Sequence, residues 1–197
     1  TVSKALENKV KNEFNYKNVR AILNPLDLKQ IESLSDEEIA VDSHFIVAAG
    51  RMDKEEHLKQ FDKLIESYSR SELPGRNIKL VLLGDGTDKC RLEDLSKSCG
   101  VAGFVCFEGF QKNPYAYFSK AEFLVLSSKN EGFPTVLNEA LACGTPVVSF
   151  DCESGPDEII EHEINGLLVE NQNFEALKDA MERMIMDTDL YSTCKKN

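Results

Sequence analysis

The sequence is poor in basic residues and has neither a long apolar run nor a paired-cysteine motif. Its 197 residues include 23 Lys and Arg against 34 Asp and Glu, which gives a formal net charge of −11. This acidic balance argues against nucleic acid and anionic membrane surfaces as partners, because both attract basic surfaces. No apolar stretch approaches the ~20 residues that a membrane-spanning helix needs. The hydrophobic share of 42% is nevertheless enough for a folded core.

Residue patterns that hold a metal ion are absent as well. The six cysteines include no C-x-x-C pair, and the three histidines are dispersed along the chain. Cys106 and Cys143 lie in apolar stretches, which is typical of reduced, buried thiols in a cytosolic protein. We therefore expect no metal site and no cofactor, and a cytoplasmic location.

Short apolar runs alternate with segments of helical periodicity along most of the chain. A continuous run such as KLVLLG (79–84) predicts a strand that is buried on both faces. The alternation predicts an α/β fold, a Rossmann-like open parallel sheet of about six strands with helices on both faces. The expected strands cover 44–50, 79–84, 104–109, 122–128, 146–150 and 166–170. The expected helices begin near Leu58, Leu92, Asn113, Pro134, Pro156 and Phe174.

The two ends of the chain differ from this pattern. The segment ILNPLD (22–27) is interpreted as the end of a strand followed by a turn, and the acidic residues 33–43 as a linker. We expect residues 1–43 to be the tail of a preceding domain with its linker, 44–186 the main domain, and 187–197 a C-terminal tail. The first residue is Thr rather than Met, which favours a piece of a longer protein.

Candidate functional residues follow the strands, because ligands of open α/β sheets bind at the carboxyl ends of the strands. The first strand is followed by Gly50 and Arg51, and Lys59 lies near the start of the next helix. An arginine fork and a lysine point charge favour a diphosphate, although taken alone both residues also fit a solvated surface. Gly84 lies in a tight turn after the second strand, where Lys89 occupies the place of the third glycine of a dinucleotide fingerprint.

The segment EGFPTVLNE (131–139) carries the densest group of candidates. Pro134 suits the first position of a helix, and Gly132 and Phe133 before it offer no capping side chain. The free amides of this helix start therefore need a partner such as an anion or a sugar hydroxyl. Glu131 precedes the helix and Glu139 lies in its second turn, so the two carboxylates indicate two subsites.

A similar helix start follows the next strand. Gly155 and Pro156 open a short helix there, and Asp157 and Glu158 lie in its first turn. We interpret these two acids as charges that complement the dipole of their own helix.

Together these motifs resemble the C-terminal domain of family 4 (group 1) retaining glycosyltransferases, which have the GT-B fold. The matching pieces come in the order of the family: AAGRM, KQFDKLIESY, LVLLGDG, FEGF, FLVLSS, EGFPTVLNEALACGTPVV, ESGPDEII and NGLLVE. They cover roughly residues 44 to 186, and ILNPLD is similar to the junction between the two domains of the family.

The resemblance implies a role for each candidate. Arg51 and Lys59 match the basic pair on the donor diphosphate, and Glu131 matches the glutamate at the donor sugar. The gap between the two basic residues is about three residues longer than the family pattern, which makes Lys54 the substitute for Lys59. Glu139 matches the glutamate that accepts hydrogen bonds from the ribose. The remaining implied donor-binding residues are Gly50, Gly84, Phe110, Gln111, Gly132, Phe133, Pro134 and Thr135, with Phe110 and Gln111 where the base packs.

The resemblance further implies transfer of a hexosyl or N-acetylhexosaminyl group from a nucleotide-sugar, with a UDP-linked donor favoured. The acceptor would be a glycan or glycolipid of bacterial surface polysaccharide, held by a missing N-terminal domain. That domain would also mediate any association with the inner face of the cytoplasmic membrane, and the isolated fragment is expected to be inactive.

Two other functions stay open at this point. One is a nucleotide-sugar binding module without transfer activity, since fold alone does not prove activity. The other is a dinucleotide-dependent oxidoreductase domain, which is disfavoured because the first strand ends in Gly-Arg rather than in a glycine-rich turn.

Overall fold

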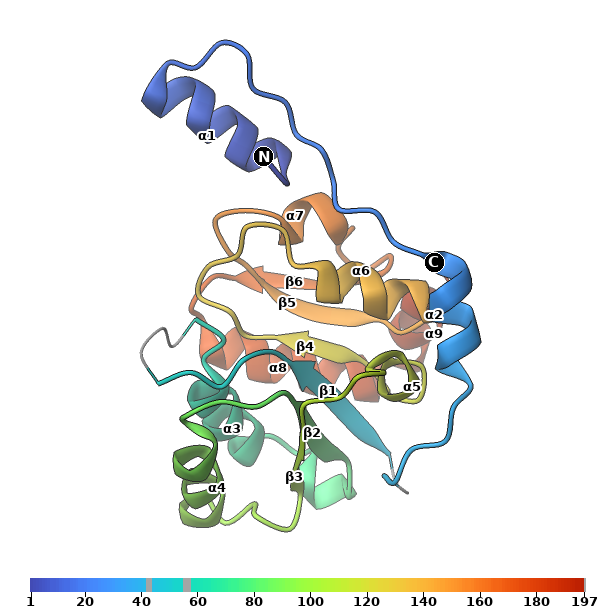
Figure 1. Ribbon diagram of the computed structural model, residues 1–197. Helices are drawn as coiled ribbons and strands as arrows, with labels where there is room; N and C mark the ends of the chain where they lie inside the picture. Colours follow the sequence, from blue (N-terminus) through green and yellow to red (C-terminus); the bar gives the residue numbers. More distant parts are fainter. Residues whose placement is uncertain (42–43, 55–57, 197) are drawn as a thin grey trace.

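The computed structural model describes residues 1–41, 44–54 and 58–196 (Figure 1). Within these ranges, six parallel strands form one sheet in the order β3-β2-β1-β4-β5-β6. The strands are β1 (Phe45–Ala49), β2 (Lys79–Leu83), β3 (Val105–Gly109), β4 (Leu124–Leu126), β5 (Val147–Asp151) and β6 (Gly166–Glu170). The predicted α/β fold with an open parallel sheet of about six strands is confirmed.

Helices cover both faces of the sheet, so the strands are buried on two sides (Figure 1). Ile46 and Ala48 of β1 pack into one core, while Phe45 and Val47 pack into the other, as the two-residue period of a strand requires. The first face carries α3 (Phe61–Arg70), α4 (Lys89–Ser98), α8 (Phe174–Met186) and α9 (Thr188–Lys196). The second carries α5 (Tyr115–Phe118), α6 (Thr135–Ala142), α7 (Pro156–Ile159) and, packed on α5 and α6, α2 (Leu28–Ser35). A short 3-10 helix, Pro74–Arg76, precedes β2.

The chain ends are more ordered than the sequence indicated. Residues 187–197 were expected to be a tail, but α9 buries Leu190 and Cys194 in the same core as α3 and α8. The N-terminal segment contains α1 (Lys4–Phe14), which was not predicted. The boundary expected at residue 43 falls on 42–43, outside the described residues, and stays a prediction.

The interpretation of ILNPLD as a strand end is wrong. Among the described residues this segment pairs with no strand, and a strand needs a neighbour for its ladder of hydrogen bonds. Instead, the Asp27 side chain accepts a hydrogen bond from the Gln30 amide (3.1 Å) and caps α2. Helix α2 also takes up the first residues of the expected linker, and Ile31 on it is buried.

The strand order predicts a crevice at the carboxyl ends of the strands, between β1 and β4. Strands β2 and β3 are added to one side of β1, and β4, β5 and β6 to the other, so the order in which strands are added reverses between β1 and β4. Parallel sheets of this order bind ligands outside the carboxyl ends of the strands at this reversal. Within the described ranges, no helix combines the length and the apolar character that a membrane span needs.

Candidate functional site

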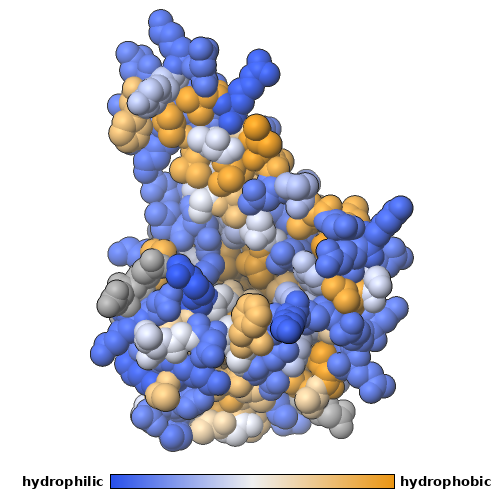
Figure 2. Space-filling view, viewed as in Figure 1, coloured by the Kyte–Doolittle hydropathy of each residue, from blue (hydrophilic) through white to orange (hydrophobic). Residues whose placement is uncertain are grey.

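A cleft of about 600 Å³ opens at the carboxyl ends of β1 and β2 and along the start of α6. Figure 2 shows a hollow with an apolar floor near the middle of the molecule. The cleft gathers residues from four separate stretches of the chain. The predicted site residues that line it are Gly50, Arg51, Lys59, Gly84, Phe110, Gln111, Glu131, Phe133, Pro134, Thr135 and Glu139.

Gly132 is the one predicted residue that does not line this cleft. It lies on an adjoining cleft of about 650 Å³, between helix α1 and the loop that carries Glu131. The wall of the first cleft also contains Asp85, Pro114 and Phe118, which the sequence did not single out, together with the apolar residues Ala49, Leu83 and Val136. Asp85 directly follows Gly84 in the turn after β2, so its position at the end of a strand was the available signal.

Lys59 and Glu131 form an ion pair inside the cleft. The Nζ atom of Lys59 lies 2.6 Å from Oε1 of Glu131, and the two side chains are 26% and 14% exposed. The Lys59 carbonyl also accepts a hydrogen bond from the buried Ser127 hydroxyl (2.7 Å), which fixes the backbone at the end of β4. The cation predicted for a diphosphate and the carboxylate predicted for a sugar are therefore in direct contact.

The stem of Lys59 lies across Gly50. A methyl group at Gly50 would stand 2.9 Å from Cγ and Cε of Lys59, so the glycine leaves the space in which the lysine reaches the cleft. Lys54, the substitute considered for Lys59, is exposed and does not line the cleft. The structure thus favours Lys59, while part of the long gap between the basic residues, 55–57, lies outside the described residues.

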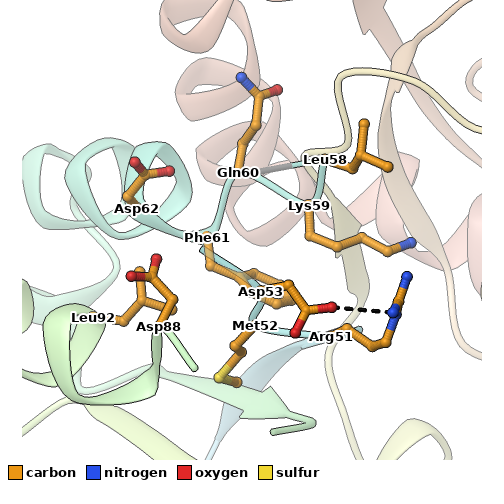
Figure 3. A pocket seen from close by; sticks show the side chains of 10 residues that line it. All are labelled: Arg51, Met52, Asp53, Leu58, Lys59, Gln60, Phe61, Asp62, Asp88 and Leu92. Atoms are coloured by element: carbon orange, nitrogen blue, oxygen red, sulfur yellow. Dashed lines mark ion pairs between the residues drawn. The ribbon is translucent and has the colours of Figure 1, made fainter. Parts of the chain in front are cut away.

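Arg51 lies beside Lys59 but nearer to solvent. Its guanidinium is 3.1 Å from the Asp53 carboxylate, and its side chain is 74% exposed. Figure 3 shows that both cations extend to the same side, away from Asp62, Asp88 and Leu92. Behind them lies a small pocket of about 70 Å³ lined by Met52, Phe61 and Leu92.

Helix α6 begins without a side-chain cap, as predicted. Its first helical residue is Thr135, and Pro134 takes the capping position, one residue later than the sequence indicated. No side chain hydrogen-bonds to the first amides of α6 in the described part of the chain. These amides border the cleft together with the basic pair, so three sources of positive potential converge there.

Glu139 lies in the second turn of α6 and faces the cleft. Burial raises the pKa of Glu139 above its ordinary value of 4.5. Among the described residues, no donor hydrogen-bonds to its carboxylate. A half-buried acceptor without a partner is suited to a ligand that brings hydroxyl donors.

The opposite wall is formed by the segment after β3. Phe110 is 74% exposed there, and Gln111 donates from Nε2 to the Glu108 carbonyl (2.6 Å). An exposed aromatic ring at the mouth of a polar cleft offers a flat apolar surface for a planar ligand group. No group of three or more His, Cys, Asp or Glu side chains suited to a metal ion occurs in the described ranges.

Comparisons with known proteins agree with this geometry. Residues 29–197 match the model of the family described as Glycosyl transferases group 1. The chain belongs to the group 1 glycosyltransferase family, and the resemblance stated from its motifs is confirmed. The alternative of an oxidoreductase domain is therefore dropped.

Two curated bacterial relatives are close in sequence. The chain is 36% identical over 179 residues to an N-acetylgalactosamine-N,N'-diacetylbacillosaminyl-diphospho-undecaprenol 4-alpha-N-acetylgalactosaminyltransferase of Campylobacter jejuni, covering 91% of this chain and 47% of that protein. It is 32% identical over 154 residues to the lipopolysaccharide 1,6-galactosyltransferase of Escherichia coli, covering 76% of this chain and 41% of that protein. The chain thus spans about half or less of these relatives.

The fold also matches a solved structure. S. aureus TarM, in a complex that contains UDP, superposes with a TM-score of 0.84 at 22% identity, covering 99% of this chain and 38% of that one. At this identity the likeness concerns the fold, which is that of the GT-B glycosyltransferases.

Proposed function

We propose that this chain binds a nucleotide-sugar donor in the cleft described above and forms the donor half of a retaining glycosyltransferase. The observation that carries the proposal is the convergence of Arg51, Lys59, Glu131 and Glu139 on one cleft beside the uncapped start of α6. In this proposal, Arg51, Lys59 and the α6 amides hold the diphosphate, Glu131 holds the sugar, and Glu139 accepts from the ribose. The base stacks near Phe110.

The chemistry requires this distribution of charge. When the bond between the anomeric carbon and the diphosphate oxygen breaks, its electron pair stays on the diphosphate, whose negative charge grows. Fixed donors aimed at that charge lower the barrier, and here Lys59, Arg51 and the start of α6 supply them. Because the Glu131 carboxylate is paired with Lys59, we assign it to the sugar hydroxyls rather than to nucleophilic attack.

For the whole protein we propose transfer of a hexosyl or N-acetylhexosaminyl group to a glycan or lipid-linked acceptor of a bacterial surface polysaccharide. Two of the relatives support this acceptor class, since one is named as a diphospho-undecaprenol enzyme and the other as a lipopolysaccharide enzyme. The UDP in the TarM complex supports a UDP-linked donor. We place the protein in the cytoplasm, with the acceptor and any membrane contact held by a part outside this chain.

Calorimetry with UDP, GDP and NAD tests the proposal and the role of Glu139 together. We expect UDP to bind, NAD not to bind, and Glu139→Gln to weaken UDP binding by about 1–3 kcal/mol through lost charged hydrogen bonds. Binding of none of the three ligands, or unchanged affinity in the variant, would contradict these roles. A transfer assay on the full-length protein separates the transferase from a module that only binds.

The same variant is expected to stabilise the ligand-free protein. Because the pKa of Glu139 is higher in the folded protein than its ordinary value, the ionised carboxylate destabilises the fold at neutral pH. This cost disappears as the pH falls through the raised pKa. Thermal unfolding at pH 7 should therefore show Glu139→Gln more stable by about 0.5–2 kcal/mol, a gain that shrinks in acid.

A methyl group at Gly50 should disturb binding without disturbing the fold. The three atoms nearest to a methyl group at Gly50 all belong to the flexible stem of Lys59, so the stability change of Gly50→Ala should stay within about 1 kcal/mol. The displaced ammonium should weaken UDP binding by about 10-fold or more. Gly103→Ala, where a methyl group meets no atom within 4 Å, is the matched control for calorimetry and unfolding. Equal UDP affinity in both variants would show that Lys59 reaches the diphosphate without the space that Gly50 leaves.

A further inference from the structure

The loop after β5 presses against the backbone that carries Glu131. Ser154, which is 3% exposed, donates a hydrogen bond from its hydroxyl to the Glu131 carbonyl. Gly155 has a φ of +101°, and a methyl group there would lie 2.6 Å from Cδ of Pro134 and 3.1 Å from Cα of Phe133. We call residues 153–158, which include the first residues of α7, the bridging loop, and residues 131–134 the donor loop. The two loops are therefore joined by a buried hydrogen bond and by a close backbone contact that leaves no room for a side chain at Gly155.

The other side of the bridging loop holds helix α1. The two carboxylate oxygens of Glu158 accept hydrogen bonds from the amides of Lys4 and Ala5, each at 2.9 Å. Glu153 forms an ion pair with Lys9, one turn further along α1. Glu158 was expected to complement its own helix, but its carboxylate caps a helix more than 150 residues away. Figure 1 shows α1 standing beyond α7, apart from the layers that cover the sheet.

Helix α1 also borders the donor loop itself. The nearest side chains to Gly132 are Val2 and Leu6, which a methyl group there would meet at 3.7 Å. Leu6 and Lys9 line the adjoining cleft of about 650 Å³ together with Glu131. The bridging loop thus lies between a docked helix and the carboxylate assigned to the donor sugar.

We propose that the bridging loop couples the docking of α1 to the conformation of the donor loop. Ser154 and Gly155 are positioning residues for Glu131, and Glu153 and Glu158 hold α1. The proposal rests on the proposed function for its consequence, which is that docked α1 strengthens donor binding. Because coupling is reciprocal, a bound donor must also hold α1 more firmly.

Hydrogen exchange in the ligand-free chain tests the coupling without reference to any donor. Glu158→Gln is expected to speed amide exchange across residues 4–14 and, through the bridging loop, across 131–142, each by about 5-fold or more. Glu161→Gln is the control, because its exposed side chain makes no hydrogen bond in the described part of the chain. Faster exchange at 4–14 with no change at 131–142 would overturn the proposal.

Ser154→Ala tests the link from the other side. Its control is Ser149→Ala, because Ser149 is also buried but donates to the Phe150 carbonyl within β5. In the wild-type chain, UDP-N-acetylglucosamine should slow exchange across 4–14, and Ser154→Ala should abolish this slowing and weaken binding by about 5-fold or more.

The outcomes separate the two proposals. If Ser154→Ala and Ser149→Ala behave alike in both exchange and binding, Ser154 is not a positioning residue and the coupling is wrong. If the wild-type chain binds no nucleotide while Glu158→Gln still speeds exchange at 131–142, the coupling stands and the proposed function fails.

Discussion

Replacing Lys59 by alanine is expected to lower kcat/KM of the full-length transferase by about 30- to 1,000-fold, or 2–4 kcal/mol. The ammonium is lost from the diphosphate subsite, and Glu131 is left as an unpaired carboxylate near a second anion. Because both changes act most strongly when charge grows on the leaving group, kcat should fall along with donor affinity. Steady-state kinetics with varied donor measures the two effects separately.

Companion variants identify the cause. Arg51→Ala should cost less than Lys59→Ala, because the Arg51 side chain is 74% exposed and that of Lys59 is 26% exposed. Lys63 lies in the first turn of α3 as an exposed cation that pairs with Glu66, so Lys63→Ala should leave the kinetics unchanged. Adding Glu131→Gln to Lys59→Ala should restore diphosphate affinity in part, since it removes the unpaired charge. If Lys59→Ala keeps wild-type kinetics, the diphosphate assignment is wrong.

The order and type of the central elements could be predicted because the four inner strands β2, β1, β4 and β5 are buried on two faces. In KLVLLG every residue after Lys79 is apolar, which an amphipathic surface helix would not show. The terminal helices α1 and α9 were not predicted because they bury few of their residues. Helix α1 buries none of its own residues, and the three apolar residues on one side of it, Leu6, Val10 and Phe14, do not stand out among its many charged and polar neighbours. Helix α9 buries only Leu190 and Cys194 between charged neighbours.

The cleft could be predicted from one geometric rule, since residues that follow parallel strands meet at one edge of the sheet. That rule brings Gly50, Arg51 and Glu131 together without any knowledge of pairwise contacts. The rule does not predict contacts between side chains that belong to elements far apart in the sequence. The Lys59 to Glu131 ion pair spans 72 residues and the Glu158 cap of α1 spans 154, and no local pattern records either.

Gly84→Ala is expected to destabilise the fold by about 3 kcal/mol or more, because the methyl group meets backbone rather than a movable side chain. A methyl group there would lie 1.9 Å from the carbonyl oxygen of Gly50, and Gly84 has a φ of +128°. The Gly50 amide is also hydrogen-bonded to the Leu83 carbonyl (2.9 Å), so the ends of β1 and β2 cannot separate without losing this bond.

Two other glycines separate backbone strain from close contact. Gly100 has a φ of +74° but no atom within 4 Å of a methyl group, so Gly100→Ala should cost only about 1–2 kcal/mol. Gly103→Ala meets neither restriction and should lie within about 1 kcal/mol of wild type. Denaturant unfolding, analysed with a shared m-value, measures the loss of unfolding free energy in each of the three variants. If Gly84→Ala lowers the free energy of unfolding no more than Gly100→Ala does, the ends of β1 and β2 can move apart to make room for the methyl group. The shape of the cleft floor would then be set by the loops above it rather than by the contact between β1 and β2.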